Sequence, residues 1–243
     1  MALDNSAAGA ARSDESALSA DTVAWMLRLS DKLRRFVDFV GKWGSLLIIP
    51  LVLITIWDIC GRFNGKLQYW LVQNYGWIFN STLLQELEWH FHTALFALVL
   101  GYGYIQNVHV RIDLVRDHLA FRKKAWLEFL GCTLFMIPFC LIVIYFASYN
   151  VYESYQLHEG SPSTVGLSNY WIIKSVLVFG LVVAVFAGVA VWLQTVILLW
   201  GPKDIRFPLM TLEWPEEAGS KIEGKERIKL EEATDTLAPP PLQ

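Results

Sequence analysis

The sequence predicts an all-α integral membrane protein: four transmembrane helices preceded by a basic amphipathic interfacial helix, with both termini in the cytoplasm. Composition is the first reason, because 54% of the 243 residues are hydrophobic, only 18% are charged and the mean hydropathy is +0.38. The second reason is the presence of four apolar runs near the length of roughly 20 residues that a helix needs to cross the hydrocarbon core. The third is an uneven distribution of basic residues between the loops.

The four predicted spans cover residues 43–60, 87–108, 126–149 and 171–200. Their residues are apolar nearly all round, without the alternation of period two that a membrane β-strand shows. Tryptophan, whose amphipathic ring prefers the headgroup level, stands at the boundaries of these runs: Trp43, Trp89, Trp126, Trp171 and Trp200. We therefore expect a small helical bundle in residues 43–202.

Basic residues near the spans set the expected orientation, since Lys and Arg accumulate on the cytoplasmic side. Five lie between positions 28 and 42, and five more lie between positions 111 and 124. The loops on the other side hold only Arg62 and Lys66, and there is no Lys or Arg from Asn150 to Tyr170. Both termini should therefore be cytoplasmic.

Four segments lie outside the predicted spans. Residues 1–24 are rich in Ala, Ser, Asp and Glu and are expected to be disordered. Residues 25–42 repeat apolar side chains at helical spacing beside a basic face, which predicts an amphipathic helix on the cytoplasmic leaflet or, alternatively, a helix packed on a partner. Residues 62–82 form a predicted aromatic outer loop at the membrane interface, and residues 203–243 form a polar cytoplasmic tail.

The segment from Leu83 to Asp113 contains the densest group of ionisable side chains near a span. Glu86, Glu88, His90 and His92 crowd the start of the second apolar run. Ionisable groups at membrane depth usually serve a partner, a pathway or a cofactor. Three kinds of site use such residues: a haem site, a catalytic or metal centre, and a transport pathway.

A haem site requires axial ligands on facing helices. His90 and His92 share one predicted span, and the other three spans contain no His. Mixed ligation by Met136 or by a loop His stays open. A membrane-anchor subunit of a redox complex, carrying haem or quinone, is therefore the alternative function.

Neither an enzyme nor a self-sufficient transporter is expected. The sequence has no His-Glu-x-x-His, no Gly-x-Ser-x-Gly and no glycine-rich phosphate loop, and the span centres carry no ionisable residue. Cys60, Cys132 and Cys140 form no Cys-x-x-Cys pair, so no disulfide, iron–sulfur or zinc site is predicted. We expect no catalytic, cofactor-binding or metal-binding residue and no nucleic-acid partner. Polar groups at the two ends of one helix indicate an accessory subunit of a larger assembly.

These residues resemble a known family, the small membrane subunit of tripartite ATP-independent periplasmic (TRAP) transporters, and in particular its longer members. The family is similar in having four spans and cytoplasmic termini, and its signature after the second span corresponds here to His109-Val110-Arg111-Ile112-Asp113. The similarity covers roughly residues 32–201. Other similar positions lie in three places. They are Gln85 to His90 at the start of the second span, Trp57, Asp58 and Arg62 at the end of the first, and Glu159, Ser161, Gly166, Leu167, Trp171 and Lys174 before and at the start of the fourth.

The chain departs from the family's pattern in three places. Ile105-Gln106-Asn107 stands where the family tends to have small and charged residues, residues 65–79 resemble an insertion, and the proline common early in the fourth span is replaced by Val178 or Phe179. These departures affect the fine detail of an interface more than the resemblance itself.

The resemblance implies a non-enzymatic accessory subunit in the bacterial inner membrane. In such a transporter a periplasmic binding protein delivers an organic acid to a large multi-span membrane subunit, which imports it by symport with an ion, typically sodium. The small subunit stabilises and orients the large one within the lipid bilayer. The similarity to longer members points to small oxo, hydroxy or dicarboxylic acids as substrates.

Interface or structural roles are expected for nine residues: Asp58, Arg62, Glu86, Glu88, His90, His109, Arg111, Asp113 and Lys174. Arg111 and Asp113 are expected to exchange charged hydrogen bonds with the large subunit or to hold the following loop in shape. Asp58 and Arg62, spaced i, i+4, either pair at the outer interface or form a weak exposed pair.

The remaining candidates lie at the outer ends of the second and fourth spans. Glu86 and Glu88 are expected to meet basic groups of the large subunit or of the binding protein. Lys174 is expected to extend its ammonium group to the outer interface.

Overall fold

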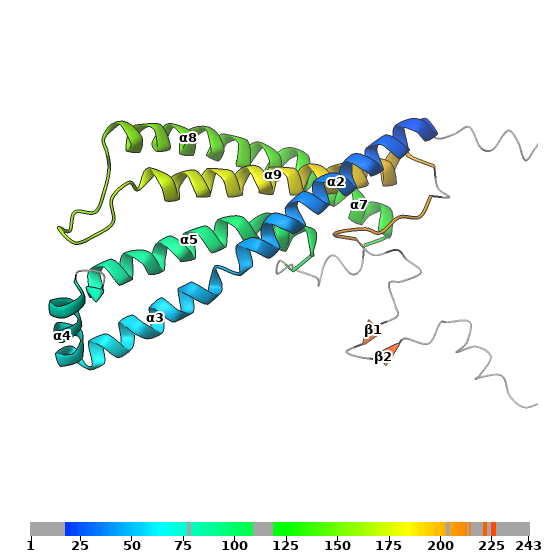
Figure 1. Cartoon of the computed structure of the whole chain (residues 1–243). Helices are drawn as coiled ribbons and strands as arrows, with labels where there is room; N and C mark the ends of the chain where they lie inside the picture. Colours follow the sequence, from blue (N-terminus) through cyan, green and yellow to red (C-terminus); the bar gives the residue numbers. More distant parts are fainter. Residues whose placement is uncertain are drawn as a thin grey trace, which may run out of the picture.

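In a computed structural model the chain folds as a bundle of long helices (Figure 1). The structure describes residues 18–76, 79–108, 119–202, 205–212 and 214, with the backbone of 221–222 and 225–226. The elements are α2 Ala20–Ser45, α3 Ile48–Phe63, α4 Gly65–Tyr75, α5 Ser81–Ile105, α7 Phe121–Leu130, the π-helical segment η2 Gly131–Met136, α8 Ile137–Gln156, α9 Trp171–Trp200, and the two-residue strands β1 Lys221–Ile222 and β2 Lys225–Glu226. The two strands pair antiparallel.

The helix α9 is the centre of the bundle. It spans the same residues as the fourth apolar run and contacts α2, α5, α7 and α8. Half of its most apolar stretch is buried within the protein, against 11% for α2–α3 and 11% for α7–α8. The helices α3 and α8 lie on either side of the α5–α9 pair, and α2 crosses over α5 and α9 (Figure 1). The outer helices therefore leave much apolar surface for lipid or for a partner.

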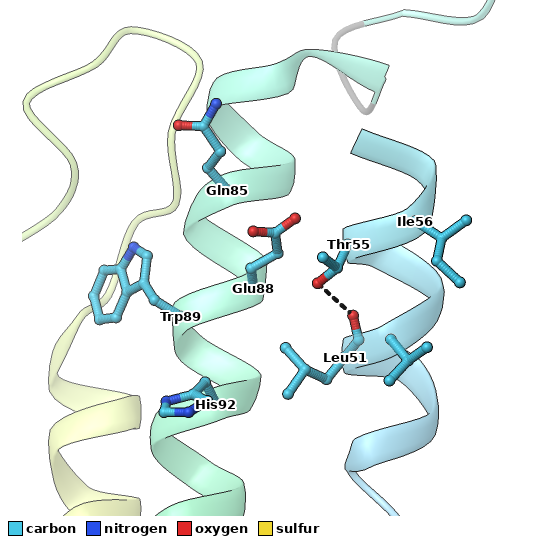
Figure 2. Close-up of a pocket in the computed structure, with 8 residues that line it drawn as sticks. Leu51, Thr55, Ile56, Gln85, Glu88, Trp89 and His92 are labelled. Carbon is cyan, nitrogen blue, oxygen red and sulfur yellow. Dashed lines mark hydrogen bonds between the residues drawn. The ribbon is translucent and has the colours of Figure 1, made fainter. Parts of the chain in front are cut away.

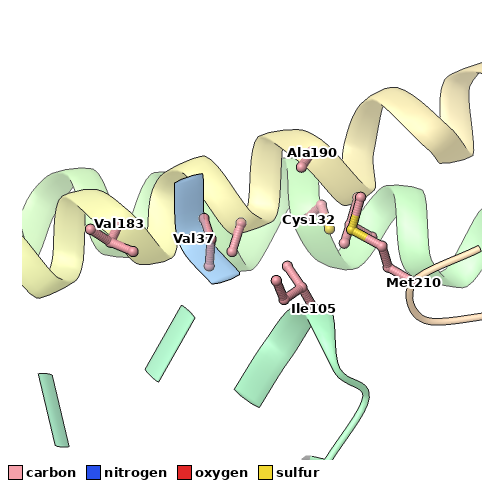
Figure 3. Close-up of a cluster of buried hydrophobic side chains, with 8 residues drawn as sticks. Val37, Ile105, Cys132, Val183, Ala190 and Met210 are labelled. Atoms are coloured by element: carbon pink, nitrogen blue, oxygen red, sulfur yellow. The ribbon is translucent and has the colours of Figure 1, made fainter. Parts of the chain in front are cut away.

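The main cluster of buried side chains joins α2, α5, η2, α9 and the segment after α9 (Figure 3). Val37, Ile105, Cys132, Val183 and Met210 are among its members. Within a bilayer, helices are held together by such close packing more than by the hydrophobic effect. Gly180 allows α9 to approach the backbone of α5 closely, because a Cβ at this position would stand 2.4 Å from the carbonyl oxygen of Ala97.

Two prolines interrupt the long helices. Between α2 and α3, Leu46 N donates to Trp43 O at 3.2 Å and Leu47 N to Gly44 O at 3.1 Å, the tighter i−3 pattern. Pro50 has no N–H for Leu46 O, four residues earlier, and its ring crowds that carbonyl. Pro138 likewise leaves Leu134 O without an α-helical partner, and the wider turns of η2 directly precede this proline.

Three helical units are long and apolar enough to cross a membrane among the described residues: Ala20–Phe63, Phe121–Gln156 and Trp171–Trp200. The helix α5 has 25 residues, but its polar first half lowers its mean hydropathy. The prediction of an all-helical, multi-pass membrane protein agrees with these findings. The count of four spans, the interfacial position of residues 25–42 and the cytoplasmic location of both termini remain predictions.

The structure differs from the sequence-based expectation in three segments. The first helix begins at Ala20, five residues earlier than predicted, because the side chain of Ser19 accepts a hydrogen bond from Thr22 N at 3.3 Å. The predicted outer loop 62–82 contains the helix α4. Residues 205–212 pack against the bundle, although a solvated tail was expected from residue 203. Residues 1–17 lie outside the described part of the chain.

The helix α4 has the usual start and stop chemistry. Asn64 Oδ1 accepts a hydrogen bond from Leu67 N at 3.4 Å, which caps the first turn. Gly76 ends the helix with φ = +94°, a conformation that costs other residues more than glycine. The segment therefore forms a helix across the end of α3.

Residues 205–212, the C-terminal segment, are held by one amide side chain of α9. Gln194 Nε2 donates to Pro208 O at 3.1 Å, and Met210 N donates to Gln194 Oε1 at 3.1 Å. Met210 and Leu212 are buried. The amide thus satisfies two backbone groups that would otherwise be left unpaired beside an apolar helix.

Candidate functional site

Six of the nine predicted site residues lie at the end of the bundle that holds α4, the start of α5 and the loop from α8 to α9, here called the α4 end (Figure 1). Their contacts form three groups. Asp58 and Arg62 lie on α3, Glu86 and His90 contact the 157–170 loop or the helix that follows it, and Glu88 faces a groove between α3 and α5.

Asp58 connects α3 to the beginning of α5. Its side chain has no exposed surface. Arg62 Nη2, one turn later, donates to Oδ2, and Ser81 Oγ donates to Oδ1 at 2.5 Å. Gln85 Nε2 donates in turn to Ser81 Oγ at 3.1 Å. A buried carboxylate with both oxygens occupied is a structural connection, which favours the paired interpretation over a weak exposed pair.

Glu86 holds the loop between α8 and α9. Ser161 Oγ donates to its Oε1, and Leu167 N donates to its Oε2 at 2.5 Å. Gly166 leaves space for this contact, because a Cβ there would stand 2.5 Å from Glu86 Oε1. Both carboxylate oxygens therefore have partners inside this chain, and the side chain has a role that requires no second subunit.

His90 is fixed by the same part of the fold. Its Nδ1 lies 2.6 Å from Glu86 O, and because a carbonyl oxygen only accepts, Nδ1 carries the proton. The ring contacts Trp89 and Tyr170, with centroid distances of 4.0 and 5.4 Å. These contacts support a role in positioning α5 against the start of α9.

Lys174 also contacts this loop. Its Nζ lies 2.5 Å from Glu159 Oε2, and the hydrogen bond from Lys174 lowers the pKa of the Glu159 carboxyl below its ordinary value. Tyr170 N donates to Glu159 O at 3.0 Å. Glu159 thus links the end of the loop to the first turn of α9.

Glu88 points away from these contacts, into a groove between α3 and α5 (Figure 2). The groove has a volume of about 500 Å³. Successive residues of an α-helix are rotated by about 100°, so Glu86 and Glu88 face nearly opposite sides of α5. Oε1 of Glu88 is buried and has no hydrogen-bond partner among the described residues. The residues that line the groove are Leu51, Val52, Thr55, Ile56, Gln85, Glu88, Trp89 and His92.

The remaining predicted site residues, His109, Arg111 and Asp113, lie outside the described residues. Within the described ranges, no group of three or more His, Cys, Asp or Glu side chains gathers as a metal site would require. His90 and His92 share α5, and His158 lies beyond the end of α8.

Two residues with clear structural roles were missed by the sequence analysis. Ser81 donates to Asp58, and Gln194 holds the C-terminal segment. Ser81 directly follows Asn80, whose side chain accepts from Thr82 N at 3.0 Å, so a helix start was the available signal. Gln194 gave a weaker signal, as a polar residue inside the apolar run of α9.

The fold and the site define a multi-pass helical membrane protein. Most of the polar side chains described at the α4 end connect helices and the loop of the same chain, whereas the carboxylate of Glu88 faces a groove. Comparison with protein families matches residues 77–197, about half of the chain, to the DctQ component of tripartite ATP-independent periplasmic transporters. The chain belongs to this family, the small permease subunits of TRAP transporters. Comparison with curated proteins and with solved structures gave no match.

The family is a transporter component and not an enzyme family. It implies association with a large membrane subunit and a periplasmic binding protein. It gives no support to the alternative of a redox anchor subunit with haem or quinone.

Proposed function

We propose that this chain is the accessory subunit that stabilises and orients the large membrane subunit of a secondary-active TRAP transporter. The transporter imports an organic acid that a periplasmic binding protein delivers, and an ion gradient, typically of sodium, drives the import. Membership of the family supports the assignment to such an assembly. The resemblance to longer members supports small oxo, hydroxy or dicarboxylic acids as the substrate class.

The proposed arrangement has four spans in the bacterial inner membrane, with α5 as the second. Its 25 residues extend about 37 Å at 1.5 Å per residue, enough to cross a hydrocarbon core. The basic residues of α2 support a cytoplasmic N-terminus and an interfacial position for this helix. With four crossings the C-terminus is cytoplasmic as well, and the α4 end faces the periplasm.

One observation carries the proposed docking of the large subunit: the unpartnered carboxylate oxygen of Glu88 in the groove between α3 and α5. A buried carboxylate oxygen without a donor is costly, and more so within a membrane. A Lys or Arg side chain from the large subunit, reaching into the groove, would supply the missing donor and the opposite charge. Glu86 requires no donor from another subunit, because both of its carboxylate oxygens already accept hydrogen bonds within this chain.

The apolar surface around the groove supports the same docking face. Ile48, Leu53 and Ile59 on α3 are all more than half exposed, and among the described residues α3 packs mainly on α5 and α4. A hydrophobic helix face with one polar position at its edge suits a helix–helix interface in a membrane.

For Arg111 and Asp113 we propose charged hydrogen bonds to the large subunit or within the following loop. The proposal rests on the resemblance of their motif to the family signature. Arg111→Ala or Asp113→Ala should reduce uptake by weakening assembly, with substrate capture by the binding protein unchanged. A normal yield of complex with abolished uptake would point instead to a direct part in transport.

The docking proposal is tested by co-purification of the large subunit with tagged variants of this chain. Glu88→Gln keeps the shape but removes the charge, and the loss of one member of a buried charge pair costs about 2–5 kcal/mol of association free energy. We expect a large drop in the co-purified subunit and in substrate uptake. Glu153→Gln, the same change at an exposed position of α8 near the α4 end, should have little effect.

Two results would contradict the proposal. If Glu88→Gln recovers as much of the large subunit as the unchanged chain, the groove is not the docking site. If the chain alone, reconstituted in liposomes, moves an organic acid down a sodium gradient, its role is not accessory.

A further inference from the structure

A second cavity lies at the opposite end of the bundle from α4, where α2 passes the end of α5 and the C-terminal segment. Its volume is about 360 Å³. Arg34, Arg35 and Lys42 of α2 line it together with Asp38, and Gln106 and Met210 contribute from the other two elements. The proposed docking of the large subunit does not use these basic side chains.

The charges around this cavity do not cancel. Asp31 pairs with both arginines, at 3.0 Å from Arg34 and 2.7 Å from Arg35. Lys42 Nζ lies 2.5 Å from Asp38 Oδ2. Among the described residues beside the cavity, three basic side chains therefore share two carboxylates, an excess of one positive charge.

The lining also supplies donors from two elements. Gln106, just after the end of α5, donates from Nε2 to Asp38 Oδ1 at 3.4 Å, which keeps the end of α5 against α2. The side chain of Arg35 is 78% exposed despite its pairing, so it is accessible to a ligand. Arginine presents several N–H groups in a fixed plane that matches the oxygens of a phosphate.

The position along α2 corresponds to the headgroup level of a bilayer. Lys42 directly precedes Trp43, a residue that is 63% exposed, and the apolar helix α3 begins five residues after Trp43, at Ile48. Tryptophan prefers the boundary between the hydrocarbon and the headgroups. Lipid phosphates lie at this level, and basic residues beside a span attract the anionic lipids of the cytoplasmic leaflet.

We propose that this cavity binds a phosphate group, carried by the headgroup of an anionic phospholipid or present as free phosphate. A phosphodiester has one negative charge, which matches the excess at the cavity. The basic face of α2 then does more than attract a charged surface: it holds one phosphate between α2, α5 and the C-terminal segment.

The test measures binding to the purified full-length chain in a non-ionic detergent by native mass spectrometry and by isothermal titration. Three ligands are compared: dioleoyl phosphatidylglycerol, inorganic phosphate, and dioleoyl glycerol, which has the same acyl chains and no phosphate. We expect phosphatidylglycerol to bind at one saturable site per chain and dioleoyl glycerol to bind far more weakly. Arg35→Gln should weaken phosphatidylglycerol binding by about tenfold or more, the range for one charged hydrogen bond.

The matched control is Lys32→Gln, which makes the same charge change on an exposed position of α2 outside the cavity lining. It should leave the affinity within about twofold, since rim charges contribute little. Saturable binding of inorganic phosphate that competes with the lipid would assign the site to phosphate from either source. Lipid binding without competition would assign it to the headgroup.

Three results would overturn the proposal. Binding of dioleoyl glycerol as tight as that of phosphatidylglycerol would show that acyl chains, not phosphate, are recognised. An equal loss of affinity for phosphatidylglycerol in Lys32→Gln and Arg35→Gln would show that the lipid is attracted to the basic face of α2 as a whole and not to this cavity. No saturable binding of any phosphate ligand would leave the cavity to another anion, such as an acidic segment of a partner.

Discussion

Glu86 and Glu88 stand two residues apart on α5, and their surroundings give them different tasks. Helical periodicity predicts that they face opposite sides, so the sequence alone separates them in direction. It cannot say what each side faces, because Ser161 and Leu167 come from a loop more than 70 residues away. Whether a carboxylate is satisfied within a chain or left for a partner is decided by such long-range contacts.

At the same scale, Asp58 should contribute strongly to the stability of the α4 end. Asp58→Asn removes the charge that Arg62 and Ser81 donate to, and hydrogen bonds to charged groups are worth about 1.5–3 kcal/mol. We expect a lower melting temperature, followed by circular dichroism in detergent. Arg62→Gln should lower it as well, because it leaves the buried Asp58 carboxylate without its opposite charge. An unchanged melting temperature for Asp58→Asn would contradict this role.

The ion pair between Glu159 and Lys174 should make the loop before α9 sensitive to acid. The pKa of Glu159 is lowered in the folded chain by the hydrogen bond from Lys174, so the ionised carboxylate stabilises the folded loop. This contribution is complete above the ordinary pKa of 4.5 and is lost as the pH falls through the lower folded value. The readout is hydrogen exchange of the Tyr170 amide, corrected for its intrinsic rate.

Protection of this amide, which donates to Glu159 O, should be constant above about pH 4.5 and should decrease as the pH falls below it. Lys174→Gln removes the cause of the shift and should remove most of the pH dependence. A decrease of the same size in Lys174→Gln would mean that another carboxylate in contact with the loop, such as Glu86 of α5, is responsible.

At the scale of elements, the sequence did not predict the helix α4 or the packing of the C-terminal segment on the bundle, for different reasons. Lys66, Gln68 and Asn74 interrupt the aromatic stretch, which favours a loop, whereas Asn64 and Gly76 are typical of the start and the end of a short helix. The C-terminal segment does carry a local signal, because Ile205, Phe207, Leu209, Met210 and Leu212 are apolar. The local sequence does not show that the segment packs on α9, where Gln194 binds the backbone at Pro208 and Met210.

The contact between α5 and α9 depends on glycine. A Cβ at Gly180 would stand 2.4 Å from Ala97 O, and a backbone oxygen cannot move aside as a flexible side chain can. Gly180→Ala should therefore force the helices apart and destabilise the bundle by about 1–3 kcal/mol, the usual cost of overpacking. Gly131→Ala is the matched control, since nothing lies within 4 Å of a Cβ there among the described residues.

Thermal unfolding of both glycine variants in the same detergent checks this prediction. Gly131→Ala should be neutral or slightly stabilising, because alanine restricts the unfolded chain more than glycine does. Equal melting temperatures for the two variants would show that α5 and α9 do not pack at this distance.

For the whole molecule, the sequence predicted where the helices lie along the chain better than it predicted which helices pack against one another. The fourth apolar run and α9 share the residues Trp171–Trp200, because a long apolar stretch between tryptophans has few other ways to fold. That α9 would be the centre, with α3 and α8 outside, follows from small residues such as Gly180 and Ala187, whose packing a hydropathy pattern does not describe. The number of crossings depends on α5, the most polar of the four candidates.

The number of crossings has a direct test, because four spans place both termini on one side and three spans place them on opposite sides. In a chain with its three cysteines replaced by alanine, single cysteines are introduced by Ser6→Cys, Gln243→Cys, Asn64→Cys and Ser163→Cys.

A membrane-impermeant maleimide added to spheroplasts should label the cysteines at positions 64 and 163 at once. It should label those at positions 6 and 243 only after the membrane is permeabilised. Labelling of position 243 without permeabilisation, with position 6 protected, would mean that α5 does not cross the membrane. The periplasmic position of Glu88 and the docking groove would then need to be reassigned.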